Sequence, residues 1–216
     1  MKTSVTLTEA APILFDLVAV IVREQGTLSE IDGQTGDGDH GVNMGKGFRL
    51  AGEKLRARGE FSFPEGLETL GDTLLSDIGG SMGPLYGTFF TDMGEVLEGA
   101  DSIDGPRFSA MMTAGLAAVQ GLGEAKPGDK TLVDVLVPAQ TAFDEAQASG
   151  KDFAASLEAL KTASAAGLEA TKDMIAKVGR ASRLGERSRG TLDAGAASCN
   201  MILQAMADGL LARLAA

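Results

Sequence analysis

The sequence predicts an all-α fold in which eight amphipathic helices form an antiparallel barrel or bundle. Apolar residues recur at helical spacing through most of the chain, and no stretch alternates convincingly with the period of two that marks a strand. Alanine is abundant, whereas the aromatic residues that favour strands make up only 5% of the chain. With 216 residues, the chain is expected to form one domain that spans residues 1–216.

The first five helices are expected to begin near Thr8, Val42, Ser62, Pro84 and Asp104. Thr8 can cap the first helix, because a threonine hydroxyl accepts a hydrogen bond from the free N–H groups of a first turn. A glycine at position 26 should end this helix. The second helix should end at residue 58, where a basic turn is followed by glycine.

Three more helices are expected to begin near Thr131, Asp152 and Gly195. The sixth helix of the chain carries Pro138, which should kink or break it because proline has no N–H to donate. The helical spacing of the seventh extends to Ile175.

Composition and charge exclude several classes of function. The net charge of −11 argues against a surface for nucleic acid or anionic membranes, and it means that a phosphate ligand would need a cation beside it. The single cysteine, Cys199, cannot form an internal disulfide, and its small neighbours indicate a core residue. No signal peptide is apparent, and the first apolar run, residues 13–22, is too short to span a bilayer. A cytoplasmic protein is therefore expected.

Four glycine-rich polar segments interrupt the helical pattern, at residues 32–43, 79–84, 123–131 and 179–195. Each holds more glycine and charge than a simple connection requires, and such loops often carry function. If the four segments gather at one end of the bundle, they form one site.

Three aspartates, Asp32, Asp37 and Asp39, lie within eight residues of the first segment. Carboxylates this close repel one another unless a cation lies between them. Their hard oxygen ligands favour Mg²⁺ or Ca²⁺ over softer metals. From the aspartates alone, a metal site and a solvated acidic turn are about equally supported.

Three known motifs nearly match this segment, and each fails for a physical reason. Residues 36–41 match the dinucleotide fingerprint, but no strand precedes them and two variable positions hold aspartates. Residues 41–47 resemble a phosphate-binding P-loop that is one residue short and lacks a hydroxyl after its lysine. An EF-hand requires glutamate at its twelfth position, where this chain has Asn43 or Phe48. What remains is a carboxylate loop that opens onto a helix N-terminus, whose free N–H groups can bind an anion.

The other three glycine-rich segments also suit an anionic ligand such as a phosphate. Residues 79–84 bring backbone N–H groups close to a helix start, and Lys126 and Lys130 offer two ammonium groups. Residues 180–189 hold four arginines, whose planar guanidinium groups fit phosphate oxygens, although a solvated basic loop is the alternative. The only histidine, His40, is expected to orient a phosphate or a carboxylate, with a structural capping role as the alternative.

Read together, four motifs resemble the nucleotide-binding (L) subunit family of dihydroxyacetone kinases. They are GDGDHGVNM at residues 36–44, GPLYGTFF at 83–90, PGDKT at 127–131, and GRAS at 179–182 continued by LGERS at 184–188. Each motif is weak alone, but the four occur in the order and separation of the family, and the resemblance covers nearly the whole chain.

The resemblance implies an eight-helix antiparallel barrel that holds ADP or ATP at one end, with two Mg²⁺ ions bridging the phosphates to Asp32, Asp37 and Asp39. Arg180 would steady the transferring phosphoryl group, and no general base is evident on this chain. The positions that match the nucleotide contacts of the family are His40, Gly41, Val42, Asn43, Ser81, Met82, Gly123, Leu132, Arg180, Asp193, Ala194 and Gly195.

The same resemblance implies partners. The family's substrate lies on a separate K subunit, bound through a histidine there, so this chain should be active only with that partner. In one branch the two parts are fused and ATP exchanges freely. In the other they are separate chains, and bound ADP is rephosphorylated in place by a phosphotransferase-system protein. A homodimer or a hetero-oligomer is expected.

This chain departs from the family at two places near the expected nucleotide. The family commonly has Ala-Ser where this chain has Ser81 and Met82. It commonly has Asp-Pro-Gly where this chain has Asp193, Ala194 and Gly195. Two alternatives also stay open. One is a kinase subunit of the same fold for another acceptor, such as a tetrose or a carrier-bound fatty acid. The other is a regulatory protein that reports nucleotide state to a transcription factor.

Overall fold

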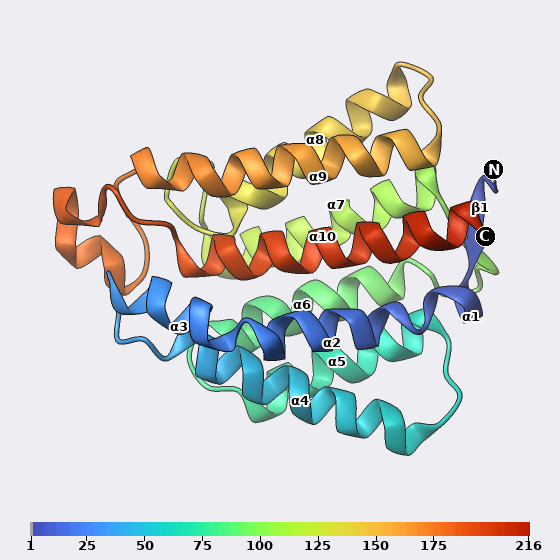
Figure 1. The fold of residues 1–216 in the computed structure, drawn as a ribbon, viewed down its shortest axis with the longest axis horizontal. Helices are drawn as coiled ribbons and strands as arrows, with labels where there is room; N and C mark the ends of the chain where they lie inside the picture. The colour runs from blue at the N-terminus through green and yellow to red at the C-terminus, as the bar shows by residue number, and fades with distance from the viewer. Residues whose placement is uncertain (1) are drawn as a thin grey trace.

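The computed structural model describes residues 2–216 and shows long helices lying side by side along one axis (Figure 1). The described residues also form two short strands, β1 (Ser4–Thr6) and β2 (Ser102–Asp104), and two 3-10 segments, η1 (Thr171–Asp173) and η2 (Arg180–Ser188). The α-helices are α1 (Leu7–Ala10), α2 (Ile13–Arg23), α3 (Gln25–Gly33), α4 (His40–Arg58), α5 (Phe63–Asp77), α6 (Met82–Glu95), α7 (Gly105–Gly123), α8 (Val133–Ala148), α9 (Phe153–Ala170) and α10 (Ala194–Ala215).

Eight of these helices form a closed ring. Helix α2 packs against α4, each later helix packs against the next one along the chain, and α10 returns to pack against α2. Successive helices run in opposite directions, so the all-α antiparallel architecture expected from the sequence is present (Figure 1). The two additional helices, α1 and α3, flank α2.

The beginning of the chain differs from the prediction of one helix over residues 8–25. Thr6, not Thr8, is the first N-cap: its hydroxyl accepts a hydrogen bond from the Glu9 N–H while the Glu9 carboxylate accepts one from the Thr6 N–H. The helix then breaks before α2, and Gly26 lies inside α3 instead of ending a helix. Helix α3 was not predicted, because its sequence is weakly amphipathic and has two glycines.

Later helix starts follow the sequence signals closely. Ser62 and Glu65 form a capping box at α5, and the carboxylates of Asp104 and Asp152 cap α7 and α9. The helix predicted to extend to Ile175 ends at Ala170, so that prediction was wrong. Helix α8 continues through Pro138 without the break that was one of the two outcomes expected there. The three-residue strands β1 and β2 pair antiparallel, and they are too short to show a period of two in the sequence.

The core fills the inside of the helical ring. Its aromatic centre contains Phe48, Tyr86, Phe89 and Phe90, whose ring centroids lie 5.1–6.4 Å apart where they pair. Cys199 is buried, as expected, and so are five of the nine methionines: Met44, Met93, Met111, Met112 and Met206. None of the helices in residues 2–216 is both long enough and apolar enough to cross a membrane.

Candidate functional site

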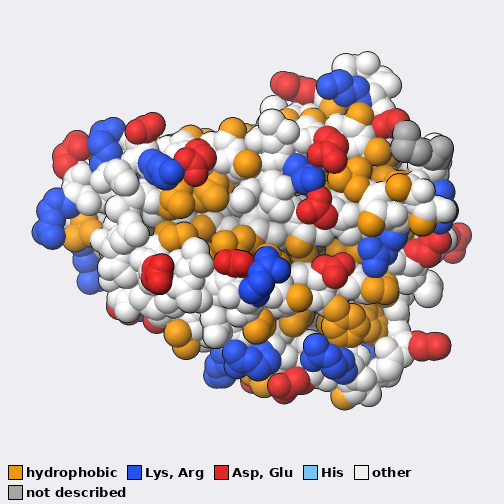
Figure 2. Space-filling view, in the orientation of Figure 1, with side chains coloured by type: hydrophobic (Ala, Val, Ile, Leu, Met, Phe, Trp, Pro, Cys, Tyr) orange, Lys and Arg blue, Asp and Glu red, His pale blue; other side chains and the backbone are white. Residues whose placement is uncertain are grey.

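The four glycine-rich segments lie at the end of the helical ring opposite the chain termini, on the left in Figure 1. Helices α4, α6, α8 and α10 begin at this end, and α3, α5, α7 and α9 finish there. Basic side chains gather over the same end of the surface, where η2 carries several of the arginines (Figure 2). The positions expected to form one site therefore share one end of the molecule.

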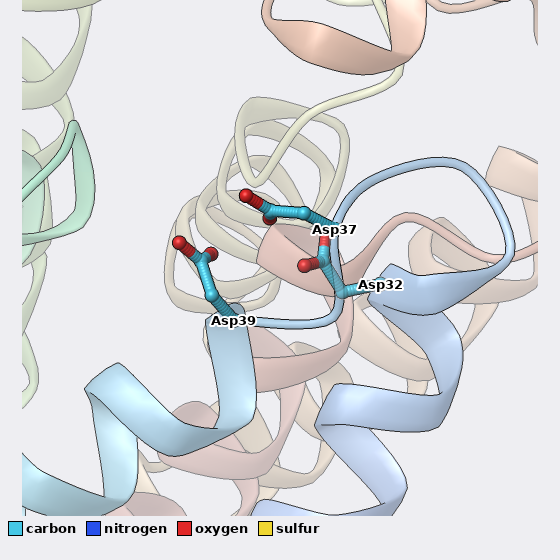
Figure 3. A group of neighbouring side chains, drawn as sticks. All are labelled: Asp32, Asp37 and Asp39. Atoms are coloured by element: carbon cyan, nitrogen blue, oxygen red, sulfur yellow. The ribbon is translucent and has the colours of Figure 1, made fainter.

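The three aspartates converge between α3 and α4 (Figure 3). Asp32 lies in the last turn of α3, Asp37 lies in the connecting turn, and Asp39 immediately precedes α4. One carboxylate oxygen from each lies within 4.8 Å of the other two. The half-buried Asp32 and the exposed Asp37 and Asp39 thus present three hard oxygen ligands to one point.

Local backbone geometry brings these carboxylates together. The Asp32 carbonyl accepts hydrogen bonds from the N–H groups of Thr35 and Gly36, at 3.0 and 2.6 Å, and this folds the chain back over the end of α3. A β-carbon at Gly36 would lie 2.5 Å from Oδ1 of Asp32, so a larger residue there would displace that carboxylate. Gly38 has a φ of +76°, which redirects the chain into α4.

Arg180 reaches the cluster from η2, 141 residues away in the chain. Its guanidinium forms an ion pair with Asp37 and a second one with Asp39, the latter at 3.4 Å. These carboxylates raise the pKa of Arg180, chiefly through the charge of Asp37. Residues 180–189 are thus joined to the acidic loop, and Arg180 pairs with two of the three carboxylates that a metal ion would use.

The first turn of α4 offers unpaired backbone donors. Asp39 is the N-cap residue, but its carboxylate makes no capping hydrogen bond, and the His40 N–H donates to Asp32 at 3.3 Å. Gly41 is buried against α3, where a β-carbon would lie 1.9 Å from the Gln25 carbonyl oxygen. Val42 is 62% exposed, an unusual position for an apolar side chain at a helix start. The turn is therefore open to an anion.

His40 is buried and bonded to α10. Its Nε2 lies 2.9 Å from the Ser198 hydroxyl, which in turn lies 2.7 Å from the Tyr86 hydroxyl. Burial lowers the pKa of His40, and the carboxylates of Asp32 and Asp39 oppose that shift. The imidazole is therefore a neutral group at neutral pH.

The start of α10 lies at the same end of the ring. The Asp193 carboxylate caps this helix by accepting a hydrogen bond from the Ala196 N–H at 2.8 Å. Burial raises the pKa of Asp193 to about 6, against the opposing effects of that N–H and of the Lys130 ammonium. A β-carbon at Gly195 would lie 3.7 Å from the Leu132 nitrogen, so Leu132, Ala194 and Gly195 adjoin one another.

The remaining expected contacts lie at the start of α6 and at the end of α7. Ser81 is exposed and Met82 half-buried at the start of α6. A β-carbon at Gly123 would lie 3.5 Å from Cδ2 of Leu85, which places the end of α7 beside α6. Next to Gly123, a recess of about 440 Å³ is lined by Gln120, Glu124, Ala125 and Lys126.

The family model of the DAK2 domain matches residues 34–208. The chain belongs to the DAK2 domain family.

This DAK2 domain is similar both to a kinase subunit of about its own length and to kinases that are much longer. It is 37% identical over 188 residues to the ADP-binding subunit DhaL of the PEP-dependent dihydroxyacetone kinase of Escherichia coli, covering 87% of this chain and 90% of that one. It is 34% identical over 193 residues to the L-erythrulose kinase of Pectobacterium atrosepticum, covering 88% of this chain and 32% of the relative.

A solved structure has the same fold. The dihydroxyacetone kinase of C. freundii in complex with AMP-PNP and Mg²⁺ superposes with a TM-score of 0.69 at 30% identity, covering 92% of this chain and 33% of that one. The DAK2 domain thus spans about a third of the longer kinases and 90% of the E. coli subunit.

One lysine of this DAK2 domain lies elsewhere than predicted, and two contacts near His40 were not predicted. Lys130 was expected to face an anion, but its side chain is 2% exposed and donates to the carbonyls of Ser188 and Thr191. The contacts of Ser198 with His40 and with Tyr86 were not predicted, because they join helices whose residues are more than 100 positions apart in the chain.

Proposed function

We propose that this DAK2 domain binds ADP or ATP together with Mg²⁺ and is the nucleotide-binding half of a two-part dihydroxyacetone kinase. The observation that carries the proposal is the convergence of Asp32, Asp37 and Asp39 at the N-terminus of α4, with Arg180 beside them. The similarity to an ADP-binding subunit along 90% of its length supports the same function.

The carboxylate cluster is slightly wider than a Mg²⁺ site. Octahedral Mg²⁺ holds oxygen ligands at about 2.1 Å, so adjacent ligands lie about 3 Å apart and opposite ligands about 4.2 Å apart. The three carboxylate oxygens lie within 4.8 Å of one another, so side-chain rotations that bring them closer would let them bind one ion, and each carboxylate has a second oxygen for another. Bound Mg²⁺ would neutralise phosphate charge that the aspartates otherwise repel. We therefore assign two ions to Asp32, Asp37 and Asp39.

The nucleotide phosphates would lie against the first turn of α4. Because the Asp39 carboxylate does not cap this helix and Asp32 accepts only from the His40 N–H, the next N–H groups of the turn are left for an anion. We propose that the nucleotide also contacts the neighbouring starts of α6, α8 and α10 and the end of α7. The full set of proposed contacts is His40, Gly41, Val42, Asn43, Ser81, Met82, Gly123, Leu132, Arg180, Asp193, Ala194 and Gly195.

Arg180 would have two consecutive roles. It neutralises Asp37 and Asp39 until cations bind these carboxylates. Its guanidinium is then available to phosphate oxygens, for which its planar donors are suited. The acceptor hydroxyl would come from the partner.

The partner would be a K-type subunit that holds dihydroxyacetone or a related small ketose. A phosphotransferase-system protein would rephosphorylate the bound ADP. A transcription regulator is a further proposed partner. The chain would form a homodimer or a hetero-oligomer. The match to a separate E. coli subunit of a PEP-dependent kinase supports this branch over the fused one.

A second candidate is a kinase subunit for a four-carbon ketose. The similarity to an L-erythrulose kinase favours it, and the proposed contacts of this chain surround the nucleotide and not the acceptor. Transfer assays that compare dihydroxyacetone with erythrulose on the same K-type partner distinguish the two.

Calorimetry with ADP tests the metal and nucleotide assignment. We expect binding in magnesium buffer, no binding after full chelation with EDTA, and no binding to Asp37→Ala, while the helical circular dichroism is unchanged. Asp72→Ala is the matched control, because Asp72 is an exposed aspartate on α5 outside the carboxylate cluster. ADP binding that survives full chelation would refute the metal bridge.

A further inference from the structure

We propose that Lys130 is a positioning residue for phosphoryl transfer. Its buried ammonium fixes the arginine segment, residues 174–192, and this segment presents Arg180 to the carboxylate cluster. The effect on transfer rests on the proposed function, whereas the fixing of the segment is a property of the chain alone.

The Lys130 ammonium binds the arginine segment on both sides of Arg180. Before Arg180, it donates to the Met174 carbonyl oxygen at 3.4 Å. After Arg180, it donates to the carbonyl oxygens of Ser188 and Thr191, the latter at 2.7 Å. The Lys130 side chain is 2% exposed, so these carbonyls take the place of water around the charge. One cation therefore holds both ends of the segment on the body of the protein.

The backbone of Lys130 is itself held by α8. The Asp134 carboxylate, in the first turn of this helix, accepts hydrogen bonds from the N–H groups of Gly128 and Thr131 at 2.5 and 2.8 Å. Lys130 has a φ of +62°, a left-handed conformation that is unfavourable for a residue with a β-carbon. The loop thus keeps an unfavourable conformation at the residue whose ammonium holds the arginine segment, and such outliers often mark a functional constraint.

The middle of the arginine segment has little packing of its own. Ala176 and Ser188 are buried, and the Ala176 N–H donates to the Ser188 hydroxyl at 2.9 Å, but residues 177–187 between them contain no buried side chain. Arg180 lies in this stretch, and its side chain is 57% exposed where it reaches the carboxylate cluster. The position of Arg180 therefore depends on what holds the ends of the stretch, and the Lys130 ammonium binds both ends.

Phosphoryl transfer depends on placing charge close to the phosphate oxygens. A displacement of about 1 Å at a reacting centre can slow a reaction about 100-fold. Loosening of the arginine segment would displace the Arg180 guanidinium by such distances. We therefore expect Lys130→Met to slow transfer with a K-type partner about tenfold or more.

A double-mutant cycle with Arg180→Ala separates this positioning role from a merely structural one. Because Lys130 acts through Arg180, Lys130→Met should slow transfer about tenfold or more in the wild-type background and less than about twofold in the Arg180→Ala background. Equal losses in both backgrounds would overturn the proposal. Lys177→Met is the matched control, because Lys177 joins the same segment to Asp129 through an exposed ion pair at 3.3 Å, and its loss should change the rate less than about twofold. A loss in Lys177→Met as large as that in Lys130→Met would also overturn it.

Spin labels measure the fixing of the segment without nucleotide or partner. Exposed Arg183 in the segment and exposed Asp72 on α5 are replaced by cysteine and labelled, while Cys199 is buried and escapes the label. We expect a narrow distribution of distances between the labels with Lys130 and a broad one in Lys130→Met; an unchanged width would overturn the proposal. Lys130→Gln, whose amide still donates to carbonyls, should give an intermediate result, and it replaces Lys130→Met in both measurements if that variant does not fold. A wild type without transfer activity would refute the proposed function and leave the distance measurement standing.

Discussion

Replacing Lys130 with methionine should make residues 174–192, which carry the four arginines, open more easily from the rest of the protein. The Lys130 ammonium is enclosed by backbone carbonyls of this segment: Ser188, Thr191 at 2.7 Å and Met174 at 3.4 Å. Its side chain is 2% exposed, and the charge of Asp193 partly offsets the lowering of its pKa by burial. Methionine preserves the length of the apolar stem and removes the charge and all three donors.

The expected loss of opening free energy in Lys130→Met follows from two opposing contributions. Hydrogen bonds from a charged donor contribute about 1.5–3 kcal/mol each, so three sum to about 4–9 kcal/mol. Burial of the ammonium opposes this by several kcal/mol, as the lowered pKa of Lys130 indicates. We expect the opening free energy of residues 174–192 to fall by about 2–4 kcal/mol, which corresponds to a loss of amide protection of about 30- to 1000-fold.

Hydrogen exchange read by mass spectrometry measures this directly. Peptides that cover residues 174–192 should lose protection in Lys130→Met, while peptides from α5 and α6 should not change. Lys126→Met is the matched control, because Lys126 is an exposed lysine of the same loop. Unchanged protection of residues 174–192 would show that the carbonyl contacts do not hold the segment, and the reasoning would be wrong.

Three further predictions concern the site. Arg180→Ala should slow coupled phosphoryl transfer with a K-type partner more than Arg183→Ala, because Arg180 alone of the two contacts the carboxylate cluster; equal rates would indicate a diffuse basic loop. The raised pKa of Asp193 means that the folded protein binds a proton more tightly than the unfolded chain, so its contribution to stability falls as the pH rises from about 4 to about 6. Asp193→Asn removes this pH dependence. In denaturant titrations in EDTA, the unfolding free energy of the variant relative to that of the wild type should therefore rise by about 1–2 kcal/mol between pH 4 and pH 6. A difference that does not change with pH would contradict the raised pKa. Finally, purified protein should carry ADP through gel filtration in magnesium buffer, because each metal bridge and loop contact slows dissociation, and transfer should require a phosphoryl donor protein. Nucleotide-free protein that turns over with ATP and a K-type subunit alone would show that ADP is exchanged freely.

Most helix starts could be predicted because their signals are local. A capping serine or aspartate acts on backbone groups two or three residues away, as Ser62, Asp104 and Asp152 do. The signals were misread where tertiary contacts overrode local preference. Helix α3 forms despite two glycines because α4 packs closely on it at Gly41, and α8 continues through Pro138 where Gly167 of α9 approaches the Asp134 carbonyl.

The sequence by itself determined the all-α class and the acidic loop as a metal candidate, because helical periodicity and carboxylate spacing are properties of neighbouring residues. The assignment of nucleotide contacts and of a single domain remains a prediction. Only the tertiary structure decided which distant groups meet: the closing of the ring by α10 on α2, Arg180 on Asp37, Lys130 beneath the arginine segment, and Ser198 on His40. The physical reason is that burial and pairing across more than 50 residues depend on how whole helices pack, and no local pattern of residue types records that packing.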